Sequence, residues 1–340
     1  MVITRTPLRI SFFGGGTDFP EFFSQNGGAV VSSTINRYSH QIVSEFPSRL
    51  FDYAIRVSYS KGELVKDVKD IQHPVIRACL QHCGFSRDVE LHYAADLPSF
   101  TGLGSSSSFT VGLLHALHAF RGERVLPSQL ANEAVHIERE VLKECVGLQD
   151  QYAAAFGGFN FIEFSGTAEP KVSHISISMG NLELLQQHIL LIFTKIKRKA
   201  VEIEQSKNLK NTQQHKALIK MRDLAYTSVK IFEARGKLDI HELGKLLEEG
   251  WSLKKSLSPL VSNLEIDRLY DIAKQHGAIA GKLLGAGGGG FLMLLAPPET
   301  HAQLAKAFRG HYVLHVELGT PGSEVIFDRR MYSKKHAKLK

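Results

Sequence analysis

The sequence of 340 residues contains only three cysteines, Cys79, Cys83 and Cys145, which are too few for a disulfide scaffold. We interpret them as reduced packing residues, because no matching His or Cys pair stands near Cys79 and Cys83. The sequence also lacks an apolar run that could span a bilayer, an apolar leader and a nucleic-acid-binding motif. The net charge of +7 fits anionic substrates, but it is spread along the chain. These absences favour a cytoplasmic protein that acts on small molecules, with neither nucleic acid nor membrane as a partner.

The order of the predicted elements indicates an α+β protein with two domains. A chain of this length accommodates two domains, and its strands and helices are segregated by region rather than strictly alternating. We therefore expect α+β sandwiches instead of a doubly wound sheet, with domains at 1–175 and 176–340. The predicted strands cover 2–13, 29–45, 53–60, 89–95, 159–164 and 189–193; the predicted helices cover 106–120, 128–145 and much of 200–275; glycine and strand pieces return at 278–295.

The most informative segment is the run Pro-Ser-Phe-Thr-Gly-Leu-Gly-Ser-Ser-Ser-Ser at 98–108. A strand-like run precedes it and an amphipathic helical run follows it, so its glycines lie on a turn that opens a helix. Glycine lets a ligand approach the backbone, and a helix start offers unpaired N–H groups and the positive end of the dipole. This chemistry suits a nucleotide phosphate, whereas a serine-capped helix after a tight turn is the alternative. The loop residues in question are Gly102, Leu103, Gly104, Ser105, Ser106, Ser107 and Ser108.

A second glycine cluster follows the first predicted strand. The strand runs into Gly14, Gly15 and Gly16, and Thr17 and Asp18 come next. The glycines leave room for a ligand beside the backbone, and the carboxylate of Asp18 can accept hydrogen bonds from sugar hydroxyls. Arg9, on the preceding strand, can hold a charge nearby. The alternative is a glycine turn in which Asp18 caps the following helix.

Two carboxylates are the strongest candidates for chemistry. Glu138 lies in the middle of the apolar stripe of the helix predicted at 128–145, where a charge is costly unless it has a partner. That partner is either an arginine, which would be purely structural, or a magnesium ion. Asp150 follows twelve residues later at the start of another helix. It is either ordinary first-turn helix chemistry or a general base for a substrate hydroxyl.

A late glycine run, at 285–290, formally satisfies G-x-G-x-x-G. We reject a dinucleotide site, because a strand-like apolar run follows it and Gly310 stands where an acidic residue would be needed. A Walker sequence is absent as well. A loop near phosphate between two strands remains one interpretation, and a permissive hairpin loop is the other.

Taken together, these motifs resemble those of the GHMP kinase superfamily, which includes galactokinase, homoserine kinase and mevalonate kinase. The order matches: an N-terminal substrate motif, a central P-x-x-x-G-L-G-S-S loop and a late G-A-G-G-G-G loop. The separation of Glu138 from Asp150 also resembles that of the metal glutamate and base aspartate of galactokinases. The resemblance implies an ATP-dependent, Mg²⁺-requiring small-molecule kinase with its active site in the cleft between two α+β domains.

The same resemblance implies a role for each motif residue. Ser105 or Ser106, together with Glu138, would be the Mg²⁺ ligands, and residues 102–108 would cradle the triphosphate. Asp150 would be the base, with Arg9 beside it to hold it as an anion. The sugar would lie against Gly15, Gly16, Thr17 and Asp18, and the late loop, including Gly287 and Gly288, would shape the cleft.

Within the superfamily the sequence is most similar to bacterial D-glycero-D-manno-heptose 7-phosphate kinases, in segments 13–18, 34–38, 150–159 and 249–251. This implies phosphorylation of the anomeric hydroxyl to the 1,7-bisphosphate, for nucleotide-activated heptose used in surface glycans. The sugar phosphate would be held by Lys197 and Arg198, in a basic run after a predicted strand. A solvated surface run is the alternative, and the phosphate would then lie near Arg37, Lys254 and Lys255. Galactokinases carry Glu-His in place of Gly15-Gly16, which disfavours galactose. A kinase of an unphosphorylated sugar such as fucose, and a non-catalytic sugar or nucleotide sensor, are the alternatives; a homodimer is left open.

Overall fold

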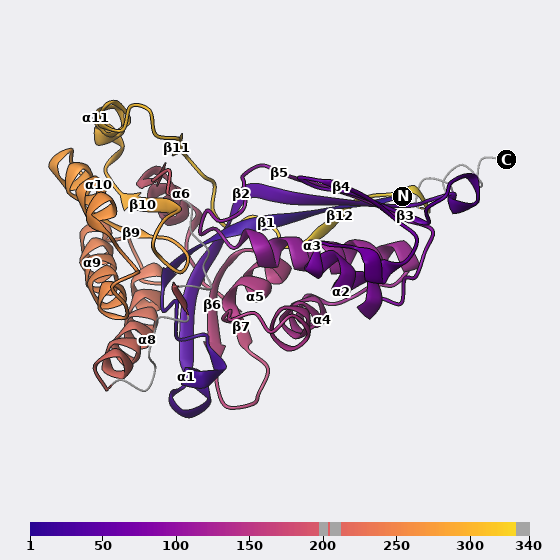
Figure 1. Cartoon of the computed structure of the whole chain (residues 1–340). Helices are drawn as coiled ribbons and strands as arrows, with labels where there is room; N and C mark the ends of the chain where they lie inside the picture. The colour runs from indigo at the N-terminus through magenta and orange to yellow at the C-terminus, as the bar shows by residue number, and fades with distance from the viewer. Residues whose placement is uncertain (197–202, 205–211, 331–340) are drawn as a thin grey trace.

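The structure is a computed structural model, and it describes residues 1–196, 203–204 and 212–330. A large mixed sheet occupies one half of the molecule, with strand order β12-β1-β2-β5-β3-β4 (Figure 1). Strand β6 also pairs with β2, and β7 pairs with β6. Its strands are β1 (Val2–Phe13), β2 (Gly28–Glu45), β3 (Ile55–Ser58), β4 (Gly62–Val65), β5 (Val89–Ala95), β6 (Phe159–Phe164), β7 (Lys171–His174) and β12 (Glu324–Asp328).

Strand β1 positions part of the site because its side chains alternate between two environments. Leu8, Ile10 and Phe12 enter an apolar core that the two halves of the molecule share. Arg9 and Ser11 line a cavity instead. The period of two in a strand separates the two sets onto opposite faces.

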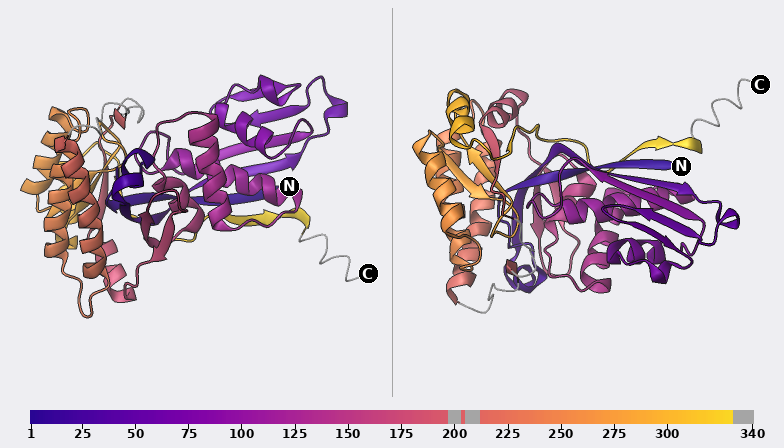
Figure 2. Two further views of the ribbon diagram at one scale, coloured as in Figure 1. Left: turned by 90° about the horizontal axis from the view of Figure 1, so that it is seen from below. Right: turned by 45° about the horizontal axis from the view of Figure 1, so that its top comes forward.

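Helices cover one face of the large sheet, as Figure 1 and the right view of Figure 2 show. The longest of them, α3, packs on β1 and β2, and its side chains such as Val111, Leu114 and Leu117 are fully buried. Short helical segments connect the strands. The helices of this half are α1 (Pro20–Asn26), α2 (Pro74–His82), α3 (Ser105–Arg121), α4 (Pro127–Val135) and α5 (Gln149–Phe156), with 3₁₀ turns at Ser48–Leu50 and Val68–Asp70 and a π-helical turn at His136–Val141.

The other half contains a smaller antiparallel sheet with strand order β11-β8-β10-β9. Helices α8, α9 and α10 lie side by side at this end of the molecule (Figures 1 and 2). The elements of this half are α6 (Met179–Gln187), β8 (Ile189–Phe193), α8 (Thr212–Phe232), α9 (Ile240–Ser256), α10 (Leu264–Gln275), β9 (Ala280–Leu283), β10 (Phe291–Leu295), a 3₁₀ turn at Pro298–Thr300, α11 (His301–Ala307) and β11 (Val313–Leu314). No helix among the described residues has the length and apolarity needed to cross a bilayer.

The predicted α+β class is confirmed, and the strands predicted at 89–95, 159–164 and 189–193 match β5, β6 and β8 at both ends. Cys79 and Cys83 are buried packing residues, as predicted. The chain changes from the large sheet to the small one between β7 and β8. Strand β12 then returns to pair with β1, so the end of the second half belongs to the first sheet.

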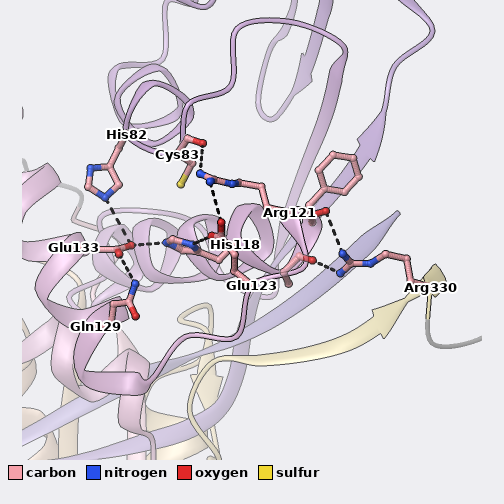
Figure 3. A network of polar contacts seen from close by, with 10 residues as sticks. His82, Cys83, His118, Arg121, Glu123, Gln129, Glu133 and Arg330 are labelled. Atoms are coloured by element: carbon pink, nitrogen blue, oxygen red, sulfur yellow. Dashed lines mark hydrogen bonds and ion pairs between the residues drawn. The ribbon is translucent and has the colours of Figure 1, made fainter.

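A polar network ties the far end of α3 to its neighbours (Figure 3). His118 donates from Nδ1 to Glu123 and from Nε2 to Glu133, each at 2.7 Å, and Gln129 donates to Glu133 at 2.8 Å. The hydrogen bond to Glu133, followed by the other carboxylate contacts, raises the pKa of His118 despite its burial. The doubly bonded imidazolium is therefore a stabilising element of this domain.

We expect His118→Gln to lower stability most at mildly acidic pH. Because the folded-state pKa of His118 is raised, its contribution is complete below about pH 6.5 and is lost as the pH rises through that raised pKa. At pH 6 the free energy of unfolding of the variant should be about 1–2 kcal/mol lower than that of the wild type. This is the value of a charged hydrogen bond, discounted for partial exposure. In thermal melts from pH 6 to pH 9, the difference in Tm between wild type and variant should become smaller as the pH rises. A difference in Tm that does not depend on pH would contradict this role.

Candidate active site

A cavity of about 490 Å³ opens between the two halves of the molecule. The loop at 98–107, the turn at 14–18 and the start of α5 line it from the first half. Lys254, Lys282, Gly285 and Ala286 line it from the second half. The structure therefore brings the separated sequence motifs to one cleft.

The central loop presents a helix start to this cavity. Gly102 and Gly104 have φ values of 80° and 72°, in the left-handed region that favours glycine. Helix α3 begins at Ser105, and no side chain caps it. The predicted alternative of a serine-capped helix is therefore wrong, and the N–H groups of the first turn are available for an anion.

The two glycine loops pack directly on each other. A Cβ atom on Gly102 would lie 2.6 Å from the carbonyl oxygen of Leu284, and one on Gly285 would lie 2.6 Å from Cα of Gly102. The amide of Phe291 donates to the carbonyl of Thr101 at 3.0 Å. This backbone contact fixes the second half of the molecule against the helix start.

Arg9 and Asp150 form a two-pronged ion pair at the centre of the cavity. Nε and Nη2 of Arg9 donate to the two carboxylate oxygens of Asp150, each at 2.8 Å, and Nη1 donates to the carbonyl of Gly102 at 2.7 Å. Arg9 is buried, whereas the Asp150 side chain is 24% exposed. A Cβ on Gly104 would lie 3.3 Å from Oδ2 of Asp150. The carboxylate thus stands beside the central loop, oriented by a buried guanidinium.

Asp18 also lies beside the start of α5. Its Oδ1 accepts from the amide of Gly16 at 2.9 Å, and its Oδ2 accepts from the amide of Gln149 at 3.1 Å. Burial raises its pKa above the usual value. It does not cap α1, which begins at Pro20 without a side-chain cap, so that alternative is wrong. A Cβ on Gly147 would lie 1.9 Å from Oδ2, which explains the glycine there.

Glu138 is fully buried in the π-helical turn behind the central loop. Its carboxylate accepts from Thr110 Oγ1 at 2.6 Å, from Ser107 Oγ at 2.9 Å and from Gln151 Nε2 at 2.5 Å. Burial raises its pKa to about 7 although all three hydrogen bonds oppose the shift. These partners are neutral, so the predicted structural alternative, a buried arginine, does not apply in the described structure.

The remaining predicted residues divide into two groups. Gly15, Gly16, Ser105, Ser106 and Ser107 line the cavity, and Ser107 also donates to Glu138. Other predicted residues pack elsewhere. The hydroxyl of Thr17 is held by the carbonyls of Gly14 and Ala29, Ser108 bonds the carbonyl of Thr6, and Leu103 is buried in the core. Gly287 and Gly288 pack on Val261, and Lys197 and Arg198 lie outside the described residues.

Several cavity residues escaped the sequence analysis. Lys282 enters from β9, and Ser11 and Gln149 flank Gly15 of the glycine turn. An aromatic group, His73, Tyr93 and Phe109, also lines the cavity, and its rings contact one another. The one available signal was Lys282, which interrupts an otherwise small and apolar strand.

Comparison with known proteins decides the family. The model of the GHMP kinases N terminal domain matches residues 67–158, and that of the GHMP kinases C terminal domain matches residues 231–313. The chain is 36% identical over 316 residues to a D-glycero-alpha-D-manno-heptose 7-phosphate kinase of Campylobacter jejuni, covering 90% of the chain and 92% of that relative. The chain belongs to the GHMP kinase family. This GHMP kinase is a phosphotransferase with an alcohol group as acceptor, and the predicted resemblance is confirmed.

Two proteins that are less identical to this chain are also similar to it. A crystal structure of a D-glycero-D-manno-heptose 1-phosphate kinase from Bacteroides thetaiotaomicron superposes with a TM-score of 0.77 at 24% identity, covering 96% of this GHMP kinase and all of that chain. An L-fucokinase/L-fucose-1-P guanylyltransferase of Bacteroides fragilis is 25% identical over 339 residues, covering 89% of the chain and 35% of that relative. The first supports the fold, and the second extends the likeness to kinases of unphosphorylated sugars.

Proposed function

We propose that this GHMP kinase transfers the terminal phosphoryl group of ATP to the anomeric hydroxyl of D-glycero-D-manno-heptose 7-phosphate. The product would be the 1,7-bisphosphate, a precursor of nucleotide-activated heptose for surface glycans. The observation that carries the proposal is the Arg9–Asp150 pair beside the uncapped start of α3, in one cleft. The identity to the heptose 7-phosphate kinase of C. jejuni supports the choice of sugar.

The cavity suits a nucleotide at its aromatic end. The rings of Tyr93 and Phe109 meet edge to face with centroids 4.7 Å apart, and the ring centroid of His73 lies 5.3 Å from that of Phe109. Aromatic surfaces of this kind accommodate a planar base. From there a triphosphate would extend along residues 102–107 toward Asp150, with its oxygens on the N–H groups of the first turn of α3.

Phosphoryl transfer requires positioning and charge neutralisation more than covalent work by the protein. In this site Asp150 would accept the proton of the anomeric hydroxyl as the oxygen attacks phosphorus. Arg9 contacts both carboxylate oxygens from one side, so it fixes the direction in which Asp150 presents its remaining lone pairs. The backbone amides at the start of α3 would stabilise the charge on the moving phosphoryl group.

The donor set behind the central loop fits a magnesium ion. Mg²⁺ prefers oxygen ligands and uses one or two carboxylates together with substrate phosphates. Ser107 lines the cavity and donates to Glu138, so a hydroxyl and a buried carboxylate stand together beside the expected phosphate path. The raised pKa of Glu138 fits a carboxylate that awaits a cation. When bound, the ion would neutralise charge on the ATP phosphates.

The opposite end suits the sugar. Asp18 and the amides of the glycine turn offer hydrogen-bonding groups, and Gly15 and Gly16 leave the space that larger side chains would fill. The predicted phosphate ligands Lys197 and Arg198 stay a prediction. Heptose 7-phosphate would place its anomeric carbon near Asp150 and its phosphate at the far end of the sugar.

The test is release of ADP from ATP in the presence of heptose 7-phosphate, unphosphorylated heptose, fucose and galactose. We expect the highest kcat/KM with heptose 7-phosphate, and release that depends on both Mg²⁺ and acceptor. Equal kcat/KM for heptose with and without its phosphate would overturn the assignment. Preference for fucose would establish the second candidate, which the likeness to the B. fragilis enzyme favours. If no ADP is released with any of the four sugars, a non-catalytic sensor would be favoured, although Arg9, Glu138 and Asp150 are all present.

A further inference from the structure

Lys282 occupies an unusual position for a lysine. It lies in strand β9, and its neighbours at two-residue spacing, Ala280 and Leu284, belong to the apolar core between the two halves of the molecule. Only 6% of Lys282 is exposed, and that edge borders the cavity. A cation on such a face is costly unless a partner compensates its charge.

The structure gives that ammonium little compensation. Lys282 Nζ donates to the carbonyl of Phe12 at 2.8 Å, at the end of β1. An ammonium has three N–H donors, and within the described ranges no carboxylate forms an ion pair with this one. Burial and the nearby guanidinium of Arg9 lower its pKa to about 7. An anion in the cavity would reverse this shift by favouring the charged form.

Two other polar groups at the same end lack partners. Oγ of Ser11 and Oε1 of Gln149 are buried and make no hydrogen bond in the described structure. A Cβ on Gly15 would lie 3.4 Å from Ser11 Oγ and 3.5 Å from Gln149 Nε2, so the two side chains flank one glycine. Ser11 is 6% exposed and lines the cavity. Buried polar atoms are nearly always bonded, so a polar ligand in the cavity can supply the partner that each of these atoms lacks.

We propose that Lys282 binds a phosphate group of the reactants, beside Ser11 and Gln149, which bind hydroxyls of the acceptor. The proposal rests on the kinase function proposed above. The phosphate has two sources, the acceptor's own phosphate and the phosphoryl group in transfer. Both offer oxygens that accept hydrogen bonds from an ammonium, and charged hydrogen bonds of this kind are short and strong.

The test compares Lys282→Met, which keeps the apolar stem, with Lys282→Arg, which keeps the charge. Lys245→Met, at an exposed position of α9, is the matched control, because it removes one lysine charge outside the cavity. Each variant is assayed with ATP and heptose 7-phosphate or unphosphorylated heptose, and its binding of heptose 7-phosphate is measured by calorimetry. Thermal melting identifies a variant in which loss of the Phe12 contact has disturbed the fold.

Two outcomes support the proposal and separate the sources. If Lys282 holds the acceptor's phosphate, Lys282→Met should raise KM and Kd for heptose 7-phosphate about ten- to a hundredfold and leave unphosphorylated heptose unaffected. If it contacts the phosphoryl group in transfer, kcat should fall by a similar factor with both acceptors, while Kd for heptose 7-phosphate stays unchanged. Lys282→Arg should recover part of either loss, and Lys245→Met should match the wild type.

Wild-type KM, Kd and kcat in a folded Lys282→Met would overturn the proposal and leave Lys282 as a link between β9 and β1. Equal loss in Lys282→Met and Lys282→Arg, with a lowered Tm in both, would overturn it as well. These results are distinct from failure of the proposed function, which appears already in the wild type as an absence of activity with heptose 7-phosphate. If the wild type is inactive with heptose 7-phosphate, kcat of the wild type and of the Lys282 variants is compared with whichever sugar the wild type phosphorylates.

Discussion

Asp150→Asn should lower kcat by about 10²–10⁴-fold while ATP still binds, because general-base catalysis typically contributes that factor. Asparagine has the size of aspartate but cannot take the proton of the attacking hydroxyl. The nucleotide contacts the central loop and the aromatic end in our proposal, neither of which includes Asp150. The KM for ATP should therefore change little, and the loss should appear in single-turnover measurements of the chemical step.

The ion pair with Arg9 complicates this substitution. An asparagine amide would turn an NH₂ group toward one of the two guanidinium donors that now bond Asp150. The Tm and the affinity for a non-hydrolysable ATP analogue show whether Arg9 has moved. Asp18→Asn is the matched control, because Asp18 is also a cavity carboxylate but is bonded to backbone amides. It should raise KM for the sugar more than it lowers kcat. Retention of more than about a third of kcat in Asp150→Asn would exclude proton transfer to this residue.

Local patterns predicted most of the fold. The alternation of β5 and the apolar run of β8 are properties of a few adjacent residues, and both strands match at their ends. The helix predicted at 128–145 instead ends as α4 at Val135 and continues as a π-helical turn. An apolar stripe does not distinguish the two hydrogen-bonding patterns, because both keep the same face inward. The pairing of β12 with β1 joins the two ends of the chain, and no local pattern encodes such a contact.

The site was predictable where a motif was contiguous. The glycine turns and the Asp150 helix start carry their chemistry in neighbouring residues, and the structure brings both to the cleft. Ser105 and Ser106 line the cavity, and their role as Mg²⁺ ligands stays a prediction. The contacts of Ser107 and Thr110 with Glu138 depend on helix phase, because residues three apart lie on one face of α3. Lys282 and Gln149 enter the cavity as single residues without a pattern, so only the folded chain reveals them.

Glu138→Gln should separate a metal ligand from a structural carboxylate by its pH dependence. The folded-state pKa of Glu138 is raised to about 7, so the folded protein favours the protonated, neutral form. The contribution of Glu138 to the free energy of unfolding is therefore complete below its unfolded pKa near 4.5 and is lost as the pH rises through 7. At pH 8 the wild type without Mg²⁺ carries the cost of a buried carboxylate.

The glutamine avoids that cost and can keep most of the bonds. Thr110 Oγ1 also lies 3.2 Å from the carbonyl of Ser106, so it can donate there and accept from the new amide. The glutamine carbonyl can still accept from Ser107 and Gln151, which now bond the same carboxylate oxygen. We therefore expect the variant to be more stable than the wild type at pH 8 by up to about 3 kcal/mol, with no difference near pH 4.5.

Magnesium should favour the wild type both in stability and in activity. If Glu138 binds the ion in the loaded enzyme, ATP with Mg²⁺ stabilises the wild type at pH 8 and narrows the gap in Tm. The variant, which lacks the charge, should need a higher Mg²⁺ concentration and have a lower kcat. Melts at pH 5 and pH 8, with and without Mg²⁺ and a non-hydrolysable ATP analogue, measure both effects. A variant that melts below the wild type at pH 8, with an unchanged Mg²⁺ titration, would make Glu138 an anchor for α3 and α5 instead, because its three hydrogen bonds would then outweigh the cost of its burial.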